Sequence, residues 1–271
     1  MTRYTHAIIC RVPNAIKSED KKAKFDLALV RKQQEDLCET LREAGLDVIE
    51  LPPEENSTVS SLFADDAAIV INGTALVTRP KKPGARTREI AGLLHDIAWQ
   101  IVEAPANEHG KPVVLEGSDV LYTGKEIFVG VRKNGTNIEG AMVVGRTFAD
   151  FAVVPVHISG THPLKHYVSL AAPEVLAVGN SKEAQEIVKR IEREATYRYK
   201  TLTIEHEESV NCINVNGHLI FRQDTPETKF QVLHEPLELW GVTTGELLKL
   251  GGQLSQYCLL VKKIKHLKNV W

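Results

Sequence analysis

The 271-residue chain lacks the features that mark secreted, metal-binding or membrane-spanning proteins. Its four cysteines form no CxxC pair and have no metal-ligand spacing. They could form two disulfides, but the first residues lack the charged, apolar and small-residue regions of a signal peptide, so we expect free thiols. No apolar run approaches the roughly 20 residues of a membrane span. We therefore expect a cytoplasmic globular protein with neither metal nor other cofactor.

The chain also lacks an excess of charge of either sign. Lys and Arg total 33 against 35 Asp and Glu, which gives a formal net charge of -2. This balance provides no general attraction to nucleic acid or to an anionic membrane. Two basic runs, at 79–88 and 262–268, could bind nucleic acid locally, but neither is interleaved with aromatic residues. We interpret them as solvated surfaces and expect neither nucleic acid nor membrane as a partner.

What the sequence does contain is a repeat of strand pairs. Four pairs have a turn signal between their two runs: AAIVINGTALV, DVLYTGKEIFVGV, YVSLAAPEVLAVG and NCINVNGHLIF. Asn-Gly flanked by apolar residues is among the strongest short-range signals of a hairpin. Each pair is followed by a predicted helix, at 85–100, 136–150, 181–194 and 225–233. A further strand is predicted after each helix, at 101–103, 151–156, 201–204 and 237–242.

The two ends of the chain supply the parts of one more unit. The N-terminal part has a strand HAIICRV, a helix at 24–44 and a strand DVIEL, and the C-terminal QYCLLVKKI adds one strand. A generic α/β sheet is the alternative, but such sheets alternate single strands with helices. The pattern predicts a single α/β domain, 1–271, that forms a five-bladed propeller of strand-strand-helix-strand units. Strands near 8–11 and 258–262 close this ring, with the helices outside and a pocket at the centre.

Polar residues recur at one position of this repeat. They lie just before or within the first strand of each pair, 45 to 50 residues apart, and are Asp66, Glu116, His162, Asn211 and Gln256. Singly, each is explained as a turn, surface or loop residue. Equivalent positions of a ring face the same axis, however, so together they predict a central polar site. A metal site that includes Cys258 is conceivable, but no ligand spacing supports it.

The sequence resembles the dimethylarginine dimethylaminohydrolase (DDAH) family of the pentein, or amidinotransferase-like, superfamily. The resemblance covers almost the whole chain and is carried by THAIICRVP, LPPEE, LFADDAAIVINGTALVTRP, LEGSDVLYTGKEIFVGV, LAVGNSKEAQ and NCINVNGHLIF. It implies hydrolysis of N-omega-methylated arginine to citrulline and methylamines, in arginine and nitric oxide metabolism. In that chemistry a cysteine thiolate attacks the guanidinium carbon, a histidine transfers protons and acids hold the cation.

The resemblance assigns roles to five acidic and basic residues. Asp66 matches the acid that grips the guanidinium, and Asp65 matches its neighbouring glutamate. Glu116 matches the carboxylate that orients and charges the histidine, and His162 matches that histidine. We therefore expect Glu116 to accept a hydrogen bond from His162 and to raise the pKa of that histidine. Arg86 falls near a basic residue that helps to hold the substrate carboxylate.

The departures from the family pattern concern the nucleophile and the substrate contacts. Gln256 falls at the position of the nucleophilic cysteine, and Cys258 lies two residues later, about 6.6 Å along a strand. Cys258 is therefore a possible substitute thiol or, more simply, a small core residue. Ser60 replaces a substrate-binding aspartate. Asn134 replaces an arginine expected to contact the substrate carboxylate, and Arg132 and Lys133 are possible substitutes for that arginine.

Two functions remain open at this point. The first is an active amidinohydrolase that uses Cys258 or another group. The second is a pseudoenzyme whose pocket binds an arginine-like or other polar small molecule, or contacts a regulatory partner. Because glutamine is not a nucleophile at neutral pH, the sequence favours the second.

Overall fold

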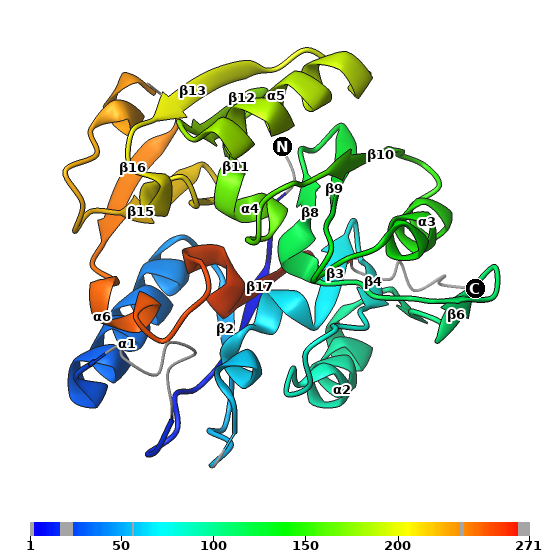
Figure 1. The fold of residues 1–271 in the computed structure, drawn as a ribbon. Coiled ribbons are helices and arrows are strands. Elements are labelled where there is room, and N and C mark those ends of the chain that lie inside the picture. The colour runs from blue at the N-terminus through cyan, green and yellow to red at the C-terminus, as the bar shows by residue number, and fades with distance from the viewer. Residues whose placement is uncertain (1–2, 17–23, 56, 234–235, 265–271) are drawn as a thin grey trace, which may run out of the picture.

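The fold is known from a computed structural model, which describes residues 3–16, 24–55, 57–233 and 236–264. Most of the second basic run, 265–268, lies outside these residues. No helix within the described ranges is long and apolar enough to cross a membrane. The chain has a mixed α/β fold (Figure 1).

The described residues form five three-stranded sheets of one design. Each sheet has an antiparallel pair, and a third strand lies parallel to one member of that pair. Four sheets follow the chain in order: β3 Ala68–Ile71, β4 Thr74–Val77 and β5 Gln100–Glu103; β8 Val120–Tyr122, β9 Glu126–Val131 and β10 Ala152–His157; β11 Val168–Ala172, β12 Val175–Gly179 and β13 Lys200–Ile204; β14 Ile213–Val215, β15 His218–Arg222 and β16 Glu238–Val242.

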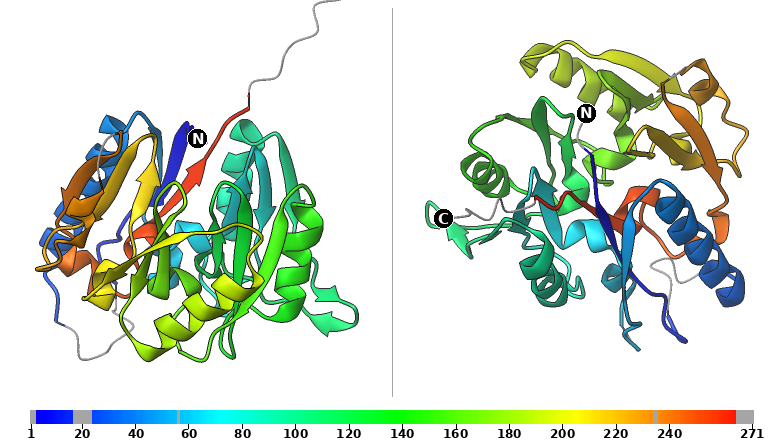
Figure 2. Two further views of the ribbon diagram at one scale, coloured as in Figure 1. Left: turned by 90° about the horizontal axis from the view of Figure 1, so that it is seen from above. Right: turned by 180° about the vertical axis from the view of Figure 1, so that it is seen from behind.

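The fifth sheet joins the two ends of the described chain. Strand β1 (His6–Cys10) pairs antiparallel with β17 (Cys258–Val261) and parallel with β2 (Asp47–Leu51). Ile8 lies opposite Leu259, and the two strands run side by side in both views of Figure 2. The predicted pairing of these strands is confirmed.

The hairpins form because their turns contain residues that tolerate a positive φ. Asn72 and Gly73, between β3 and β4, have φ values of 48° and 83°. Asn216 and Gly217, between β14 and β15, have 50° and 91°. Two consecutive positive φ angles define the type I′ turn, whose twist matches that of the strands it joins.

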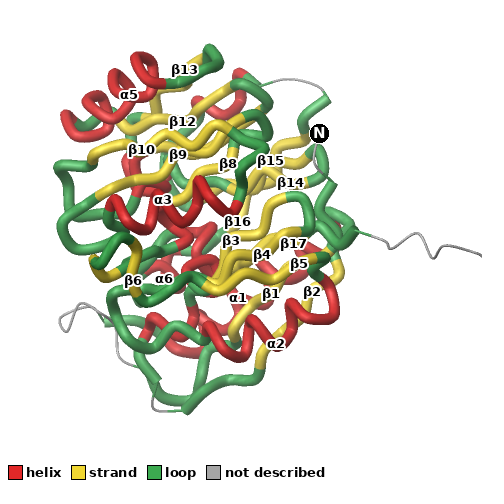
Figure 3. Tube along the Cα trace, turned by 90° about the vertical axis from the view of Figure 1, so that its right-hand side faces the viewer, coloured by secondary structure: helices red, strands yellow, loops and turns green. Residues whose placement is uncertain are grey.

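The long helices lie on the outside of the sheets. They are α1 Leu27–Glu43, α2 Thr87–Ile97, α3 Ile138–Thr147 and α5 Lys182–Glu194, and all four lie at the periphery in Figure 1. In Figure 3, α5 and α2 lie at opposite ends of the molecule with strands between them. Helix α5 buries one apolar face, Ala184, Ile187, Val188 and Ile191, as its 3–4-residue spacing predicts.

Two local features differ from the sequence prediction. The predicted helix at 225–233 is wrong, because only a 3₁₀ turn, η5 (Lys229–Val232), forms there. The Glu227 carboxylate accepts backbone hydrogen bonds from Glu205 and Lys229, and Pro226 has no N–H to donate. A small hairpin, β6 (Asn107–Glu108) with β7 (Lys111–Pro112), was not predicted.

A short helical turn precedes the first strand of every antiparallel pair. These turns are η2 Ala64–Asp66, η3 Gly117–Asp119, α4 Leu164–Tyr167, η4 Glu207–Ser209 and η6 Leu254–Tyr257. The remaining short helices are η1 Val59–Leu62 and α6 Gly245–Leu248. The polar residues that the repeat predicted lie within these turns (Asp66 and Gln256) or within two residues of them (Glu116, His162 and Asn211).

Replacing Ile8 tests the strand pairing that joins the chain ends. Ile8 has no exposed surface and packs in one cluster with Leu259 and Val261. We expect Ile8→Ala to lower the free energy of unfolding by about 2–5 kcal/mol, measured by urea denaturation. The control Val232→Ala, at a side chain 57% exposed, should change it by less than about 0.5 kcal/mol. Equal effects of the two substitutions would contradict this packing.

Candidate functional site

A closed circle of hydrogen bonds joins four of the five turns through Asn211, which lies two residues after the fifth turn, η4. The Asp66 carboxylate at the end of η2 accepts from the backbone N–H of Ser118 in η3, at 2.9 Å. Asp119, also in η3, accepts from the backbone N–H of Leu164 in α4, at 3.1 Å. Each contact runs from one turn to the next, so the side chains fix how neighbouring sheets meet.

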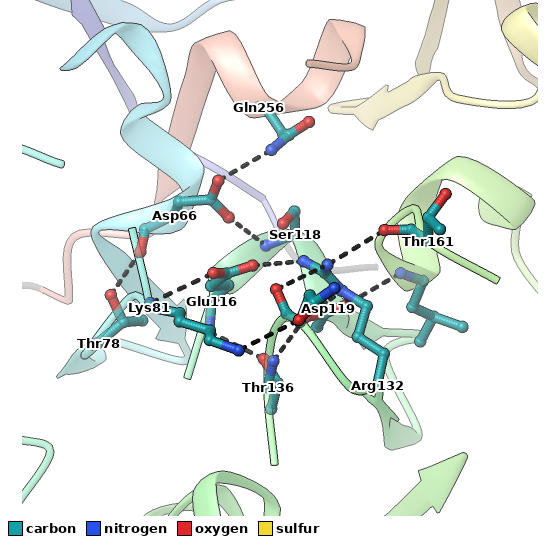
Figure 4. A network of polar contacts seen from close by, with 12 residues as sticks. Asp66, Thr78, Lys81, Glu116, Ser118, Asp119, Arg132, Thr136, Thr161 and Gln256 are labelled. Carbon is teal, nitrogen blue, oxygen red and sulfur yellow. Dashed lines mark hydrogen bonds and ion pairs between the residues drawn. The ribbon is translucent and has the colours of Figure 1, made fainter. Parts of the chain in front are cut away.

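The second half of the circle passes through an asparagine and a glutamine. Asn211, two residues after η4, donates from Nδ2 to the Lys165 carbonyl in α4 at 2.9 Å and accepts from the Ser255 N–H in η6 at 2.7 Å. Gln256 then donates from Nε2 to Asp66 Oδ2 at 2.9 Å (Figure 4). This last bond returns to η2 and completes the circle.

Close contact between η2 and η3 requires glycine at one position. A Cβ on Gly117 would lie 1.7 Å from the carbonyl oxygen of Asp65. No real Cβ approaches a backbone atom so closely, so any other residue would push the two turns apart. Gly117 therefore allows Ser118 to reach Asp66.

A cavity of about 580 Å³ lies beside this circle. Six residues predicted from the sequence line it: Ser60, Asp66, Glu116, Asn134, His162 and Gln256. Four other predicted residues, Asp65, Arg86, Asn211 and Cys258, do not line it. Within the described residues, no group of three or more His, Cys, Asp or Glu side chains is placed to hold a metal ion.

Arg132 forms the most extensive set of polar contacts in the cavity wall. Its guanidinium pairs with Glu116 through Nη2 and with Asp119 through Nε at 3.0 Å. Nη1 donates to the carbonyls of Asn134 and Thr161, each at 3.3 Å (Figure 4). Only 8% of the Arg132 side chain is exposed. One buried cation thus joins the end of β9 to η3 and to the loop at 158–163.

The prediction that Glu116 accepts a hydrogen bond from His162 is wrong. The two Glu116 carboxylate oxygens accept from Arg132 and from the backbone N–H of Lys81, at 3.3 Å for the latter. His162 instead stacks on His166, with ring centroids 4.1 Å apart and an interplanar angle of 26°. Burial, together with the charge of His162, lowers the pKa of His166 to about 4. The acid that the resemblance pairs with histidine is held by the chain's own guanidinium.

The position of Glu116 perturbs its acidity. Burial and the neighbouring Asp66 charge raise the pKa of Glu116 to about 7, because they outweigh the attraction of Arg132. A carboxyl group with this pKa is partly protonated near neutral pH. It can therefore donate as well as accept a hydrogen bond there.

Asp65 and Cys258 face a second, smaller cavity of about 140 Å³. Asp65 forms an ion pair with Lys165 at 2.8 Å. Burial raises the pKa of Asp65 to about 6 in spite of this partner. Burial also raises the pKa of Cys258 well above its ordinary value, so its thiol stays protonated at neutral pH. In three of the turns, η2, η3 and η6, residues of this cavity are chain neighbours of residues of the first one: Asp65 and Asp66, Gly117 and Ser118, Ser255 and Gln256.

Arg86 has structural partners away from the first cavity. Its side chain is buried and pairs with Glu89 through Nε at 2.8 Å and through Nη2. Nη1 donates to the Pro52 carbonyl at 2.6 Å. The predicted role of Arg86 in holding a substrate carboxylate gains no support from this position.

The sequence does not predict the two residues that hold the acids of the cavity wall. Arg132 is predicted only as a possible substitute for the arginine missing at Asn134, although it holds Glu116. Ser118, whose backbone N–H holds Asp66, has no predicted role. No spacing signal identifies either residue, because each depends on how η3 meets the turns beside it.

Comparison with known proteins gives the family. No family model matches the chain. Proteins named "Putative hydrolase DDAH2" from Homo sapiens and Bos taurus are each 34% identical to it, over 97% of this chain and 96% of theirs. The chain belongs to the DDAH family. Another member, the N(G),N(G)-dimethylarginine dimethylaminohydrolase of Streptomyces coelicolor, is 30% identical over 63% of this chain and 64% of its own.

Solved structures agree with this DDAH-family fold. A cysteine-to-serine variant of DDAH from Pseudomonas aeruginosa, complexed with citrulline, superimposes with a TM-score of 0.79 over 95% of this chain and 99% of its own, at 21% identity. The N-terminal domain of the cyanobacterial arginine dihydrolase ArgZ, bound to substrate, gives a TM-score of 0.78 over 95% and 98%, at 16% identity. At these identities the likeness establishes the pentein fold of the chain.

The raised pKa of Glu116 predicts how stability depends on pH. Between its ordinary pKa of 4.5 and about 7, the folded protein holds a proton on Glu116 that the unfolded chain has lost. This contribution to stability is therefore complete below about pH 4.5 and is lost as the pH rises through about 7.

We expect the unfolding free energy of the wild type, relative to that of Glu116→Gln, to fall between pH 5 and 7.5. Urea denaturation of both proteins at each pH measures the difference, since other titrating groups are common to both. A relative rise over this range would show that the Arg132 ion pair, and not burial, dominates the Glu116 carboxyl.

Proposed function

We propose that this DDAH-family protein binds a small polar ligand with an arginine-like skeleton in the first cavity and does not hydrolyse it efficiently. The observation that carries the proposal is the hydrogen bond from Gln256 to Asp66. A carboxamide at the nucleophile position has no electron pair of thiolate strength to attack a guanidinium carbon. The amide group also donates one of the two hydrogen bonds that the Asp66 carboxylate accepts. The family resemblance puts a substrate cation beside this carboxylate.

Cys258 is a poor substitute for the missing nucleophile. Only 3% of the Cys258 surface is exposed, and the residue borders the second cavity. Its sulfur lies 3.8 Å from the Ser255 carbonyl, within hydrogen-bonding distance for a thiol. Because burial raises the pKa of this thiol, little thiolate forms at neutral pH. These facts support a role for Cys258 in packing.

Hydrolysis of methylated arginine is the alternative function. It is favoured by the polar groups Asp66, Glu116 and His162 in one cavity and by relatives described as hydrolases. Without covalent attack, these groups would have to activate water against a resonance-stabilised guanidinium. Loss of the nucleophile costs about 10⁶-fold in rate in a measured protease example, so we expect at most weak turnover.

We further propose that the five sheets are the blades of one closed α/β propeller that makes up a single domain. The terminal strands pair with each other, and the circle of side-chain hydrogen bonds links η2, η3, α4 and η6 through Asn211, next to η4. Closure of this kind leaves few free sheet edges.

Citrulline release from dimethylarginine tests the proposed loss of catalysis. The wild type should release little or no citrulline, and Gln256→Cys should gain release, because it places a thiol beside Asp66. Gln256→Ser is the matched control, since it loses the same hydrogen bond without gaining a thiol. Both substitutions open the circle and should lower the unfolding free energy by about 1–3 kcal/mol, so each is first checked by circular dichroism.

Cys258→Ser provides the opposing test. We expect it to leave the low wild-type rate unchanged. Robust wild-type turnover that Cys258→Ser abolishes would overturn the proposal and identify the protein as an active hydrolase.

A further inference from the structure

The carboxylates that face the first cavity are already occupied by donors from the chain itself. Both oxygens of Asp66 accept amide hydrogen bonds, from Ser118 and Gln256 at 2.9 Å each. Both oxygens of Glu116 accept hydrogen bonds as well, from Arg132 and the Lys81 backbone. An entering guanidinium would have to displace these donors or share the acceptors with them.

Arg132 also places a positive charge in the cavity wall. It lies between Glu116 and the fully buried Asp119, and its three guanidinium nitrogens all donate to protein oxygens. A second guanidinium directed at Glu116 would meet this cation at short range with little solvent to screen it. The wall is thus built around a guanidinium that the protein supplies itself.

Ser118 contributes a polar atom that lacks a partner. The residue is 1% exposed and lines the first cavity, and its hydroxyl makes no hydrogen bond with the described residues. A buried hydroxyl without a partner costs roughly 1–3 kcal/mol. A ligand that offered an acceptor oxygen to Ser118 would recover this cost.

A guanidinium and a ureido group are isosteric, but this cavity wall offers them different interactions. A guanidinium has five N–H donors, a fixed charge and no acceptor. A ureido group has the same planar shape but is neutral, and a carbonyl oxygen replaces one nitrogen. That oxygen can accept from Ser118, and the remaining ureido N–H groups can donate to unused lone pairs of Asp66.

We propose that the cavity selects a neutral ureido or amide ligand over a guanidinium of the same skeleton, with Ser118 as the donor to its carbonyl oxygen and Arg132 as the residue that sets the preference. This inference rests on the proposed function, because it assigns the head group of the ligand in the same cavity. Partial protonation of Glu116 near neutral pH further reduces the negative charge available to a cation.

Calorimetric titration with citrulline and with arginine tests the preference directly. The two probes share the α-amino acid end and differ in a ureido against a guanidinium head. We expect the wild type to bind citrulline at least about tenfold more tightly, which corresponds to about 1.4 kcal/mol. Ser118→Ala should weaken citrulline binding about 3- to 10-fold, the effect of one hydrogen bond, and leave arginine binding unchanged. The control Ser159→Ala changes an exposed serine that does not line this cavity and should alter neither affinity.

Replacing the guanidinium of Arg132 should weaken the preference for citrulline over arginine. Arg132→Gln removes the cation, so arginine should bind more tightly relative to citrulline than in the wild type, whereas Arg132→Lys keeps the charge and should retain the preference. Arg132→Gln leaves Asp119 buried without a cation and could prevent folding. In that case the ratio of citrulline to arginine affinity in the wild type and the citrulline affinity of Ser118→Ala still test the inference.

Two failures can be told apart. Arginine binding as tightly as citrulline in the wild type, or an unchanged citrulline affinity in Ser118→Ala, would overturn the inference and leave the binding function intact. If neither probe binds at millimolar concentration, the proposed binding of an arginine-like ligand is itself overturned, and this inference with it.

Discussion

The hydrogen bond between Gln256 and Asp66 is the contact on which the centre of the protein depends. It links η6, near the end of the described chain, to η2, and it completes the circle that passes through η3, α4 and Asn211. The backbone pairing of β17, which follows η6, with β1 joins the two ends of the described chain. Gln256, which the family resemblance assigns to the nucleophile position, is thus a structural contact in this protein. Its amide fixes the position of the acid beside it.

The electrostatics of the wall follow from a similar internal pairing. Four acids in or next to η2 and η3 (Asp65, Asp66, Glu116 and Asp119) lie beside two cations, Lys165 and Arg132. Burying that many carboxylates is costly, and raised pKa values at Asp65 and Glu116 express this cost. Arg132 reduces this cost because its guanidinium pairs with both Glu116 and Asp119. The same contact occupies the carboxylate that the family resemblance assigns to His162.

Much of the fold could be predicted from the sequence because it repeats local signals. The Asn-Gly turns, the apolar runs and the spacing of α5 are each readable within a few residues. The complementary half-units at the two ends predicted the pairing of β1 with β17. The segment at 225–233 failed because Glu227 caps backbone N–H groups there, which a helical pattern does not reveal.

The candidate site was predictable only in part. Repeat position and family resemblance brought Asp66, Glu116, His162 and Gln256 to one cavity. They could not give the hydrogen-bond partners, because these depend on distances between turns that are far apart in the sequence. Arg132 lies 16 residues after Glu116, yet the contact between them decides what Glu116 can do.

In η2, η3 and η6, adjacent residues border different cavities, and this limits which mutations the site can accept. Asp65 and Asp66, Gly117 and Ser118, and Ser255 and Gln256 border different cavities although they are adjacent in the chain. Inserting or deleting one residue in a turn would therefore exchange the side chains presented to the two cavities. The length of each turn is a stricter constraint than the identity of the residue it presents. Substitution at 256, in η6, alters the chemistry of the first cavity, whereas the Cys258 thiol, at the start of β17, borders the second cavity and cannot reach the first without a shift of the strand.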